Sequence, residues 1–188
     1  MTDRETVTVA SRADLRGWLE TNHRRRDAIW LATYKKHHPD HFPWIEAVEE
    51  LLCWGWVDAV TRRVDGDRSA HLVAPRKATS AWSAVNRALV ETARASGAMT
   101  AAGEAVIATA MANGQWTFLD DVEAGIVPGD LARALGDLRP VWDGWPRSVT
   151  RGMLEWLKTA RTDATRSKRL ADIVENAARG QRPSIFRR

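Results

Sequence analysis

The chain has 188 residues, a formal net charge of +4, 44% apolar residues and 28% charged residues. This composition is typical of a globular protein with its own core, and it excludes a disordered or collagen-like chain. The one cysteine, Cys53, excludes an internal disulfide framework and favours a reducing, cytoplasmic location. We expect no signal peptide and no membrane span, because no apolar stretch is long enough for either.

Basic residues are concentrated near the C-terminal end. From Lys158 to Arg188 there are nine basic and three acidic residues, which leaves a net charge of −2 for residues 1–157. Such a segment could contact nucleic acid or an acidic surface. No aromatic residue for base stacking lies among the charges of residues 158–182. We therefore favour a solvated basic face on a packed helix.

Predicted strands and helices are mixed in the first half of the chain. Alternating or β-branched patterns predict four strands: 5–9, 29–34, 56–64 and 69–74. An Asp65-Gly66 turn should join the last two. Helical spacing and capping residues predict three helices. The first covers residues 12–22 with Ser11 as N-cap, and the second runs from Pro43 to Gly55. The third is capped by Thr79 or Ser80 and ends at Gly97. This order favours an α+β fold over a doubly wound parallel sheet.

The pattern after Gly97 is mostly helical. Helices are expected at four segments: 100–113, 128–138, 148–160 and 162–179. Residues 114–128 should be irregular, and residues 139–147 should form a structured loop. We therefore predict an α+β domain over residues 1–98, with a small antiparallel sheet and flanking helices. A helical C-terminal region with a basic tail should follow over residues 99–188.

The Arg76-Lys77 pair is the strongest indication of a binding site. It comes just before a predicted helix, whose first N–H groups lack partners and lie at the positive end of the helix dipole. Two cations beside that end could hold a phosphate or a carboxylate through charge-assisted hydrogen bonds. The alternative is that both are solvated charges beside a helix cap.

Aromatic and polar residues surround this pair in the sequence. Trp54, Trp56 and Asp58 share one face of a strand if the chain is already extended there. The Asp58 carboxyl could act as an acid or base beside the indoles, or it could pair with one of three arginines: Arg62, Arg76 or Arg87. Trp82 and Asn86 have i,i+4 spacing and therefore share one face of the predicted helix. An indole beside an amide could frame a planar ligand or could pack in the core, and the sequence favours neither.

Other reactive residue types have simpler explanations. Cys53 lies at the end of a predicted helix, where the dipole disfavours a thiolate, so we expect a buried inert thiol. His37, His38 and His41 lie in one short loop, whereas zinc ligands usually come from separated elements, so we expect no metal. The familiar phosphate-loop, dinucleotide, metalloprotease and esterase motifs are absent, and we expect no cofactor.

Six stretches in order resemble the YdeI/OmpD-associated family, also called bacteriocin-protection proteins, from about Ser11 to Pro183: WLETNH, WLATYKK, WIEAVEELLCWGWVD, APRKATSAWSAVN, GAMTAAG and WLKTARTDATRSKRLADIVENAARGQRP. The resemblance implies a YjbR/CyaY-like α+β domain with an antiparallel sheet, followed by helices. It also implies an association with envelope stress and with resistance to cationic antimicrobial peptides or bacteriocins, and no defined reaction. The chain departs from the family at HHPDHFP, at Ala59 and at Ala78.

We therefore predict a cytoplasmic protein that binds a small anionic molecule and contributes to stress or bacteriocin resistance. The predicted ligand-binding residues are Trp56, Asp58, Arg76, Lys77, Trp82 and Asn86. One alternative is an enzyme that uses Asp58 as an acid or base in the same pocket, with its other catalytic residues undefined. Another is a module that docks nucleic acid or a protein partner through the basic C-terminal helices. The oligomeric state is not predicted.

Overall fold

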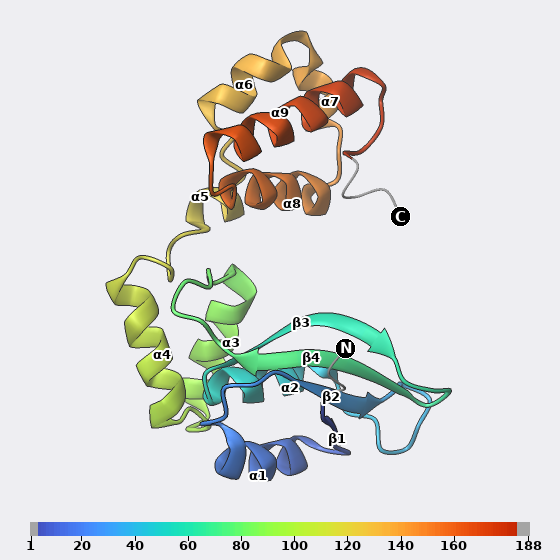
Figure 1. The fold of residues 1–188 in the computed structure, drawn as a ribbon, viewed down its shortest axis with the longest axis vertical. Helices are drawn as coiled ribbons and strands as arrows, with labels where there is room; N and C mark the ends of the chain where they lie inside the picture. The colour runs from blue at the N-terminus through green and yellow to red at the C-terminus, as the bar shows by residue number, and fades with distance from the viewer. Residues whose placement is uncertain (1–3, 184–188) are drawn as a thin grey trace. The chain divides into compact units, whose positions relative to one another are not determined.

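The structure, a computed structural model, describes residues 4–183. The chain divides into two compact units, Met1–Phe118 and Leu119–Arg188. The first unit contains a sheet with four helices, and the second is helical, so the predicted α+β class with a helical C-terminal region is confirmed (Figure 1). The first unit continues past residue 98, where we had placed a domain boundary, and includes α4 (Ala101–Ala112).

One sheet of four strands forms the centre of the first unit. Its order is β1-β2-β4-β3, where the strands are β1 (Thr6–Thr8), β2 (Ile29–Tyr34), β3 (Trp56–Arg63) and β4 (Arg68–Pro75). The β2–β4 and β3–β4 pairs are antiparallel, as predicted, but β1 pairs with β2 in parallel. The sheet is therefore mixed, because α1 (Arg12–Asn22) connects β1 to β2 as a crossover.

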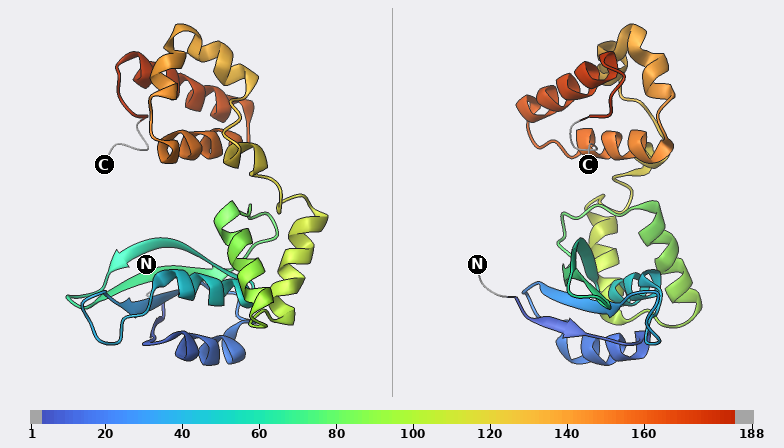
Figure 2. Two further views of the ribbon diagram at one scale, coloured as in Figure 1. Left: turned by 180° about the vertical axis from the view of Figure 1, so that it is seen from behind. Right: turned by 90° about the vertical axis from the view of Figure 1, so that its right-hand side faces the viewer.

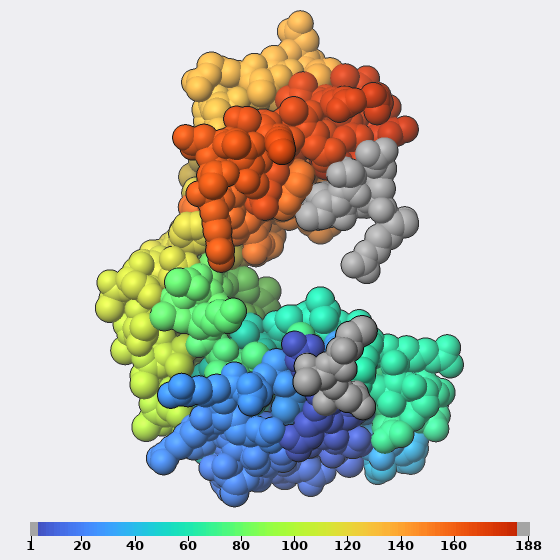
Figure 3. Space-filling model, in the orientation of Figure 1, coloured from blue at the N-terminus to red at the C-terminus, as the bar shows by residue number. Residues whose placement is uncertain are grey.

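Helices α1 and α2 (Trp44–Cys53) cover one face of this sheet (Figure 2). Leu15 and Leu19, one helical turn apart, enter the same core cluster as Leu51, Trp56 and Val73. The Trp56 indole satisfies its N–H by donating to the His23 carbonyl at 3.1 Å. The β3–β4 hairpin extends beyond the helices and forms a projecting lobe of the first unit (Figure 3).

Helix α3 (Ala84–Ala95) begins later than predicted. Its N-cap is Ser83, whose side chain accepts a hydrogen bond from the Asn86 N–H, and not Thr79 or Ser80. Residues 77–83 stay non-helical, so Trp82 lies before the helix. The backbone N–H of Trp82 donates to the Gln115 carbonyl, and its side chain packs in a second core cluster with Leu52, Val90, Ile107 and Ala110. Tertiary packing of one indole has overridden the local capping signal.

Helix α4 meets the C-terminal end of α2 at van der Waals distance. The Thr100 hydroxyl, which caps α4 through the Gly103 N–H, donates to the Cys53 carbonyl at 2.6 Å. A Cβ added at Gly103 would lie 2.4 Å from that carbonyl oxygen. Gly55, which ends the α2 turn with φ +74°, leaves no room for a side chain either, since its Cβ would lie 2.7 Å from Val106 Cγ2. Two glycines thus allow the helix contact.

The second unit consists of short helices around α8 (Arg147–Lys158) and α9 (Asp163–Ala178). The segments before α8 contain α5 (Asp120–Glu123), α6 (Gly129–Leu135), a 3₁₀ turn (Gly136–Leu138) and α7 (Arg139–Asp143). The structured loop predicted at 139–147 is therefore partly helical, because Pro140 suits the first turn of a helix. Leu131, Trp142, Met153, Leu157 and Ile173 are buried in this unit.

We predict that Gly103→Ala lowers the free energy of unfolding by about 2–3 kcal/mol, because its methyl group overlaps the Cys53 carbonyl and overpacks the junction. The matched control is Gly17→Ala in α1, where nothing lies within 4 Å of the added Cβ. There the alanine should stabilise the helix by about 0.5–1 kcal/mol. Urea unfolding of both variants measures the difference. Equal effects would show that the two helices do not approach this closely.

Candidate functional site

A cavity of about 600 Å³ lies in the first unit, where β4 ends and α4 begins. Its walls come from the end of α1, the turn after α2, the end of β4 and the first turn of α4. The lining residues are His23, Arg24, Trp54, Gly55, Pro75, Arg76, Thr100, Ala101, Ala102 and Val106. This volume is in the range of pockets that hold small molecules.

Arg76 is the cation most deeply placed in this wall. It is 8% exposed, and its guanidinium lies 3.9 Å from the centre of the Trp82 ring. One nitrogen donates to the Ala81 carbonyl, but Nε and Nη1 are buried without a hydrogen-bond partner in the described part of the chain. Burial lowers the pKa of Arg76 to about 10, and the nearby Asp58 charge opposes this shift only in part. The cavity wall therefore holds a buried charge that is poorly compensated.

The first turn of α4 adds a second source of positive potential. Thr100 uses its hydroxyl to cap the Gly103 N–H. The N–H groups of Ala101 and Ala102 have no carbonyl partner within the helix, as is general for the first helical residues. Both alanines line the cavity, and their small side chains let a ligand approach the backbone. Exposed Arg24 lies on the same wall. This combination suits an anion.

Trp54 forms the aromatic part of the wall. Its indole N–H donates to Glu50 Oε1 at 3.0 Å, and its ring lies 4.9 Å from that of His23. Glu50 is fully buried and also accepts hydrogen bonds from Arg12 Nε at 2.9 Å and Arg16 Nη1 at 2.8 Å. Three donors therefore satisfy this carboxylate, which fixes the indole against the cavity.

The six residues predicted to bind a ligand do not form one pocket lining. Arg76 lines the cavity, and Trp82, whose ring contacts its guanidinium, is not among the lining residues. The Trp56 side chain belongs to the sheet core on the α1–α2 side. Lys77 is exposed, and Asn86 lies in the first turn of α3; neither is among the lining residues.

Asp58 lies on the strand face that α2 covers. Its carboxylate accepts a hydrogen bond from the Trp44 indole at 3.3 Å, and the Trp44 ring stacks on His71 at 3.5 Å. Within the described residues no ion pair joins Asp58 to Arg62 or Arg76. Asp58 acts on Arg76 through its charge, and it is not among the residues that line the cavity.

Several cavity residues were missing from the sequence-based set. The sequence places Trp54 on a strand face but not in the predicted site, and no local pattern assigns His23, Arg24 or the start of α4 to that site. The stretch GAMTAAG did contain a usable signal, because Thr100 is a good N-cap before small residues. Its proximity to Arg76 depends on the α2–α4 contact, which no local pattern reveals.

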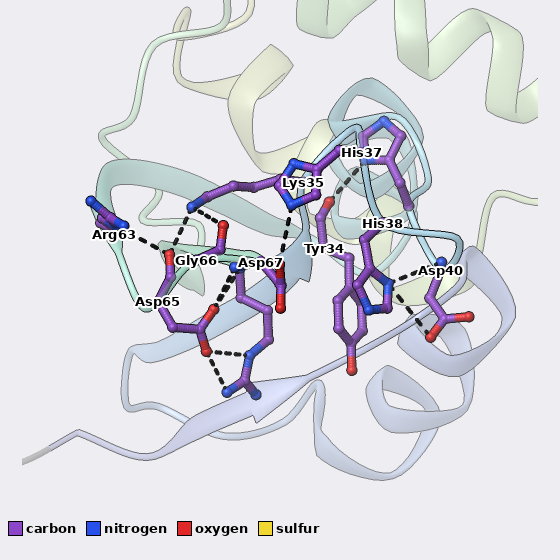
Figure 4. A network of polar contacts seen from close by, with 11 residues as sticks. Tyr34, Lys35, His37, His38, Asp40, Arg63, Asp65, Gly66 and Asp67 are labelled. Carbon is purple, nitrogen blue, oxygen red and sulfur yellow. Dashed lines mark hydrogen bonds and ion pairs between the residues drawn. The ribbon is translucent and has the colours of Figure 1, made fainter.

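Cys53 is buried, as predicted, and the histidine loop contacts neighbouring segments of the sheet. Cys53 is fully buried, and burial raises the pKa of its thiol to about 11, so the thiolate is disfavoured. His37 contacts Asp67 at 3.1 Å, and His38 stacks on Tyr34, so the loop is tied to the turn of the β3–β4 hairpin and to the end of β2 (Figure 4). No group of three or more possible metal ligands occurs among residues 4–183.

Many basic side chains of the second unit have partners within that unit. Arg166 pairs with Asp130 at 2.6 Å, and Arg179 pairs with Glu175 at 2.6 Å on the same helix. The Arg169 guanidinium lies 5.1 Å from the centre of the Trp156 ring. The contacts of Arg166 and Arg169 connect α9 to other helices of the unit, whereas the Arg179 pair lies within α9.

Comparison with known proteins divides the chain in two. Residues 7–106 match the family model described as Domain of unknown function (DUF8412), which covers about half of the chain. Residues 124–180 match the model described as Bacteriocin-protection, YdeI or OmpD-Associated. That resemblance, expected from about Ser11 to Pro183, is confirmed for this C-terminal segment. No curated protein and no solved structure matches the chain. No helix within residues 4–183 is long and apolar enough to cross a membrane.

We predict that Glu50→Gln lowers the free energy of unfolding by about 3 kcal/mol, because Arg12 and Arg16 lose a buried counter-charge. Glu104→Gln is the matched control, since its ion pair with Arg94 is largely exposed and should cost below about 1 kcal/mol. Chemical denaturation at neutral pH measures both. A loss at Glu50 no larger than that at Glu104 would contradict the assigned network.

Proposed function

We propose a function from the premise that this chain belongs to the family described as Domain of unknown function (DUF8412). The first unit is a binding module for a small anionic molecule, and the ligand occupies the cavity between Arg76 and the start of α4. The chain as a whole acts as a cytoplasmic protein of the YdeI/OmpD-associated type that contributes to stress or bacteriocin resistance.

The observation that carries the binding proposal is the state of Arg76. A buried cation without a carboxylate partner costs free energy, and a site evolves to tolerate it when a ligand supplies the missing charge. The cavity lies against this residue and against the positive end of α4. The charge of Arg76 and the N–H groups of α4 would both stabilise an anion bound there. Each charge-assisted hydrogen bond contributes about 1.5–3 kcal/mol. Two or three of them correspond to micromolar affinity.

The family type and the location rest on separate observations. The match of residues 124–180 supports a role of the YdeI/OmpD-associated type. A buried, unpaired cysteine supports a reducing compartment. Kinship with the YjbR/CyaY-like superfamily is supported by the small sheet with helices packed on one face.

Inorganic phosphate tests the binding site directly. We predict that phosphate at about one hundred times its dissociation constant raises the free energy of unfolding of the wild-type protein by about 2.7 kcal/mol. Arg76→Met should lose this increase. In the absence of phosphate the same variant should be about 1–2 kcal/mol more stable than wild type, because an uncompensated charge is replaced by an apolar chain of similar size.

Lys77→Met is the matched control for that measurement. It removes a neighbouring cation that is exposed and does not line the cavity, so the response to phosphate should persist. Denaturation with and without phosphate gives all of these values. An equal loss in the two variants would mean that phosphate binds the exposed surface, and an unchanged response in Arg76→Met would overturn the proposed site.

The resistance role has a cellular test. We predict that a bacterial strain that expresses the wild-type chain survives a cationic antimicrobial peptide better than a strain without it. Arg76→Met, expressed at the same level, should give less protection because the cavity no longer holds its anion. Survival curves measure the effect. Equal killing of the wild-type strain and the strain without the chain would contradict the role.

A further inference from the structure

The cavity walls have two chemically different halves. Cationic and donor groups come from Arg24, Arg76 and the first turn of α4. The remaining wall is mostly apolar and comes from Trp54, Gly55, Pro75 and Val106, with His23 beside them. A free inorganic anion would leave this apolar half in contact with water. The lining therefore suits a molecule with one anionic end and one apolar body.

The apolar half is shaped for a flat group. Gly55 contributes a wall without a side chain, and the tight approach of Val106 prevents one from being added there. Trp54 stands beside this surface with its indole N–H held by Glu50. The Trp54 and His23 rings already form a tilted pair at 4.9 Å. A third ring can join such a pair by offset or edge contact, which aromatic groups favour.

We infer that the ligand of this cavity is an aromatic ring that carries a single anionic group, a phosphate or a carboxylate. The anionic group lies between Arg76 and the N–H groups of α4, and the ring lies against Trp54 and His23. This inference rests on the proposed anion-binding function and specifies the rest of the molecule. Glu50 is a positioning residue here, because it orients the Trp54 indole without lining the cavity.

Three phosphates separate the contributions of charge, apolar volume and aromaticity: inorganic phosphate, cyclohexyl phosphate and phenyl phosphate. Isothermal titration calorimetry on the full chain should rank them in that order of increasing affinity. Phenyl phosphate should bind about two- to tenfold more tightly than cyclohexyl phosphate, which is the usual gain of an aromatic pair beyond area burial.

Substitutions of Trp54 assign this gain to a residue. Trp54→Leu should bind the two organic phosphates equally, and a cooperative urea unfolding transition shows that the variant is folded. Trp54→Phe, which keeps a ring, should retain part of the preference. The matched control is Trp44→Leu, at the other end of α2 and outside the cavity lining, which should keep all of it.

Each result has a defined consequence. Equal affinities for phenyl and cyclohexyl phosphate in the wild-type protein would overturn the aromatic ligand while leaving the anion site intact. A preference that survives in Trp54→Leu would overturn the assignment to this wall. Failure of the wild-type protein to bind any of the three would contradict the proposed function itself, and this inference with it.

Discussion

The contact between α4 and the end of α2 is the constraint on which the rest of the first unit depends. Gly103 lets the α4 backbone lie against the Cys53 carbonyl, and Thr100 caps its own helix while donating to that same carbonyl. This contact brings a helix N-terminus to the end of β4, where Arg76 lies. The first turn of α4 thereby forms one wall of the cavity that Arg76 also lines.

Two buried charges near this junction differ in how well hydrogen bonds and ion pairs compensate them. Glu50 receives hydrogen bonds from Arg12, Arg16 and Trp54, so its burial is fully compensated and it stiffens the wall. Arg76 has an aromatic face and one carbonyl but no ion pair within the described residues. The first charge contributes to structure, and we propose that a bound ligand supplies the counter-ion of the second. This contrast is our reason for assigning the binding role to Arg76.

Local signals predicted most of the secondary structure and only part of the site. The Ser11 cap, the Asp65-Gly66 turn and the extents of α1 and β2 followed from nearby residues. The start of α3 did not, because Trp82 is held in the core by a distant segment. Arg76 does line the cavity, but the prediction that it binds a ligand assumed a helix just after it. The helix end that lies at the cavity belongs to α4, which only tertiary contacts could reveal.

The most direct measurement is anomalous diffraction from a crystal of the full chain that contains tungstate, a heavy analogue of phosphate. Our account predicts a tungsten peak in the cavity, within hydrogen-bonding reach of Arg76 and the Ala101 and Ala102 N–H groups. Tungsten peaks confined to exposed lysines and arginines elsewhere, with water alone in the cavity, would contradict it.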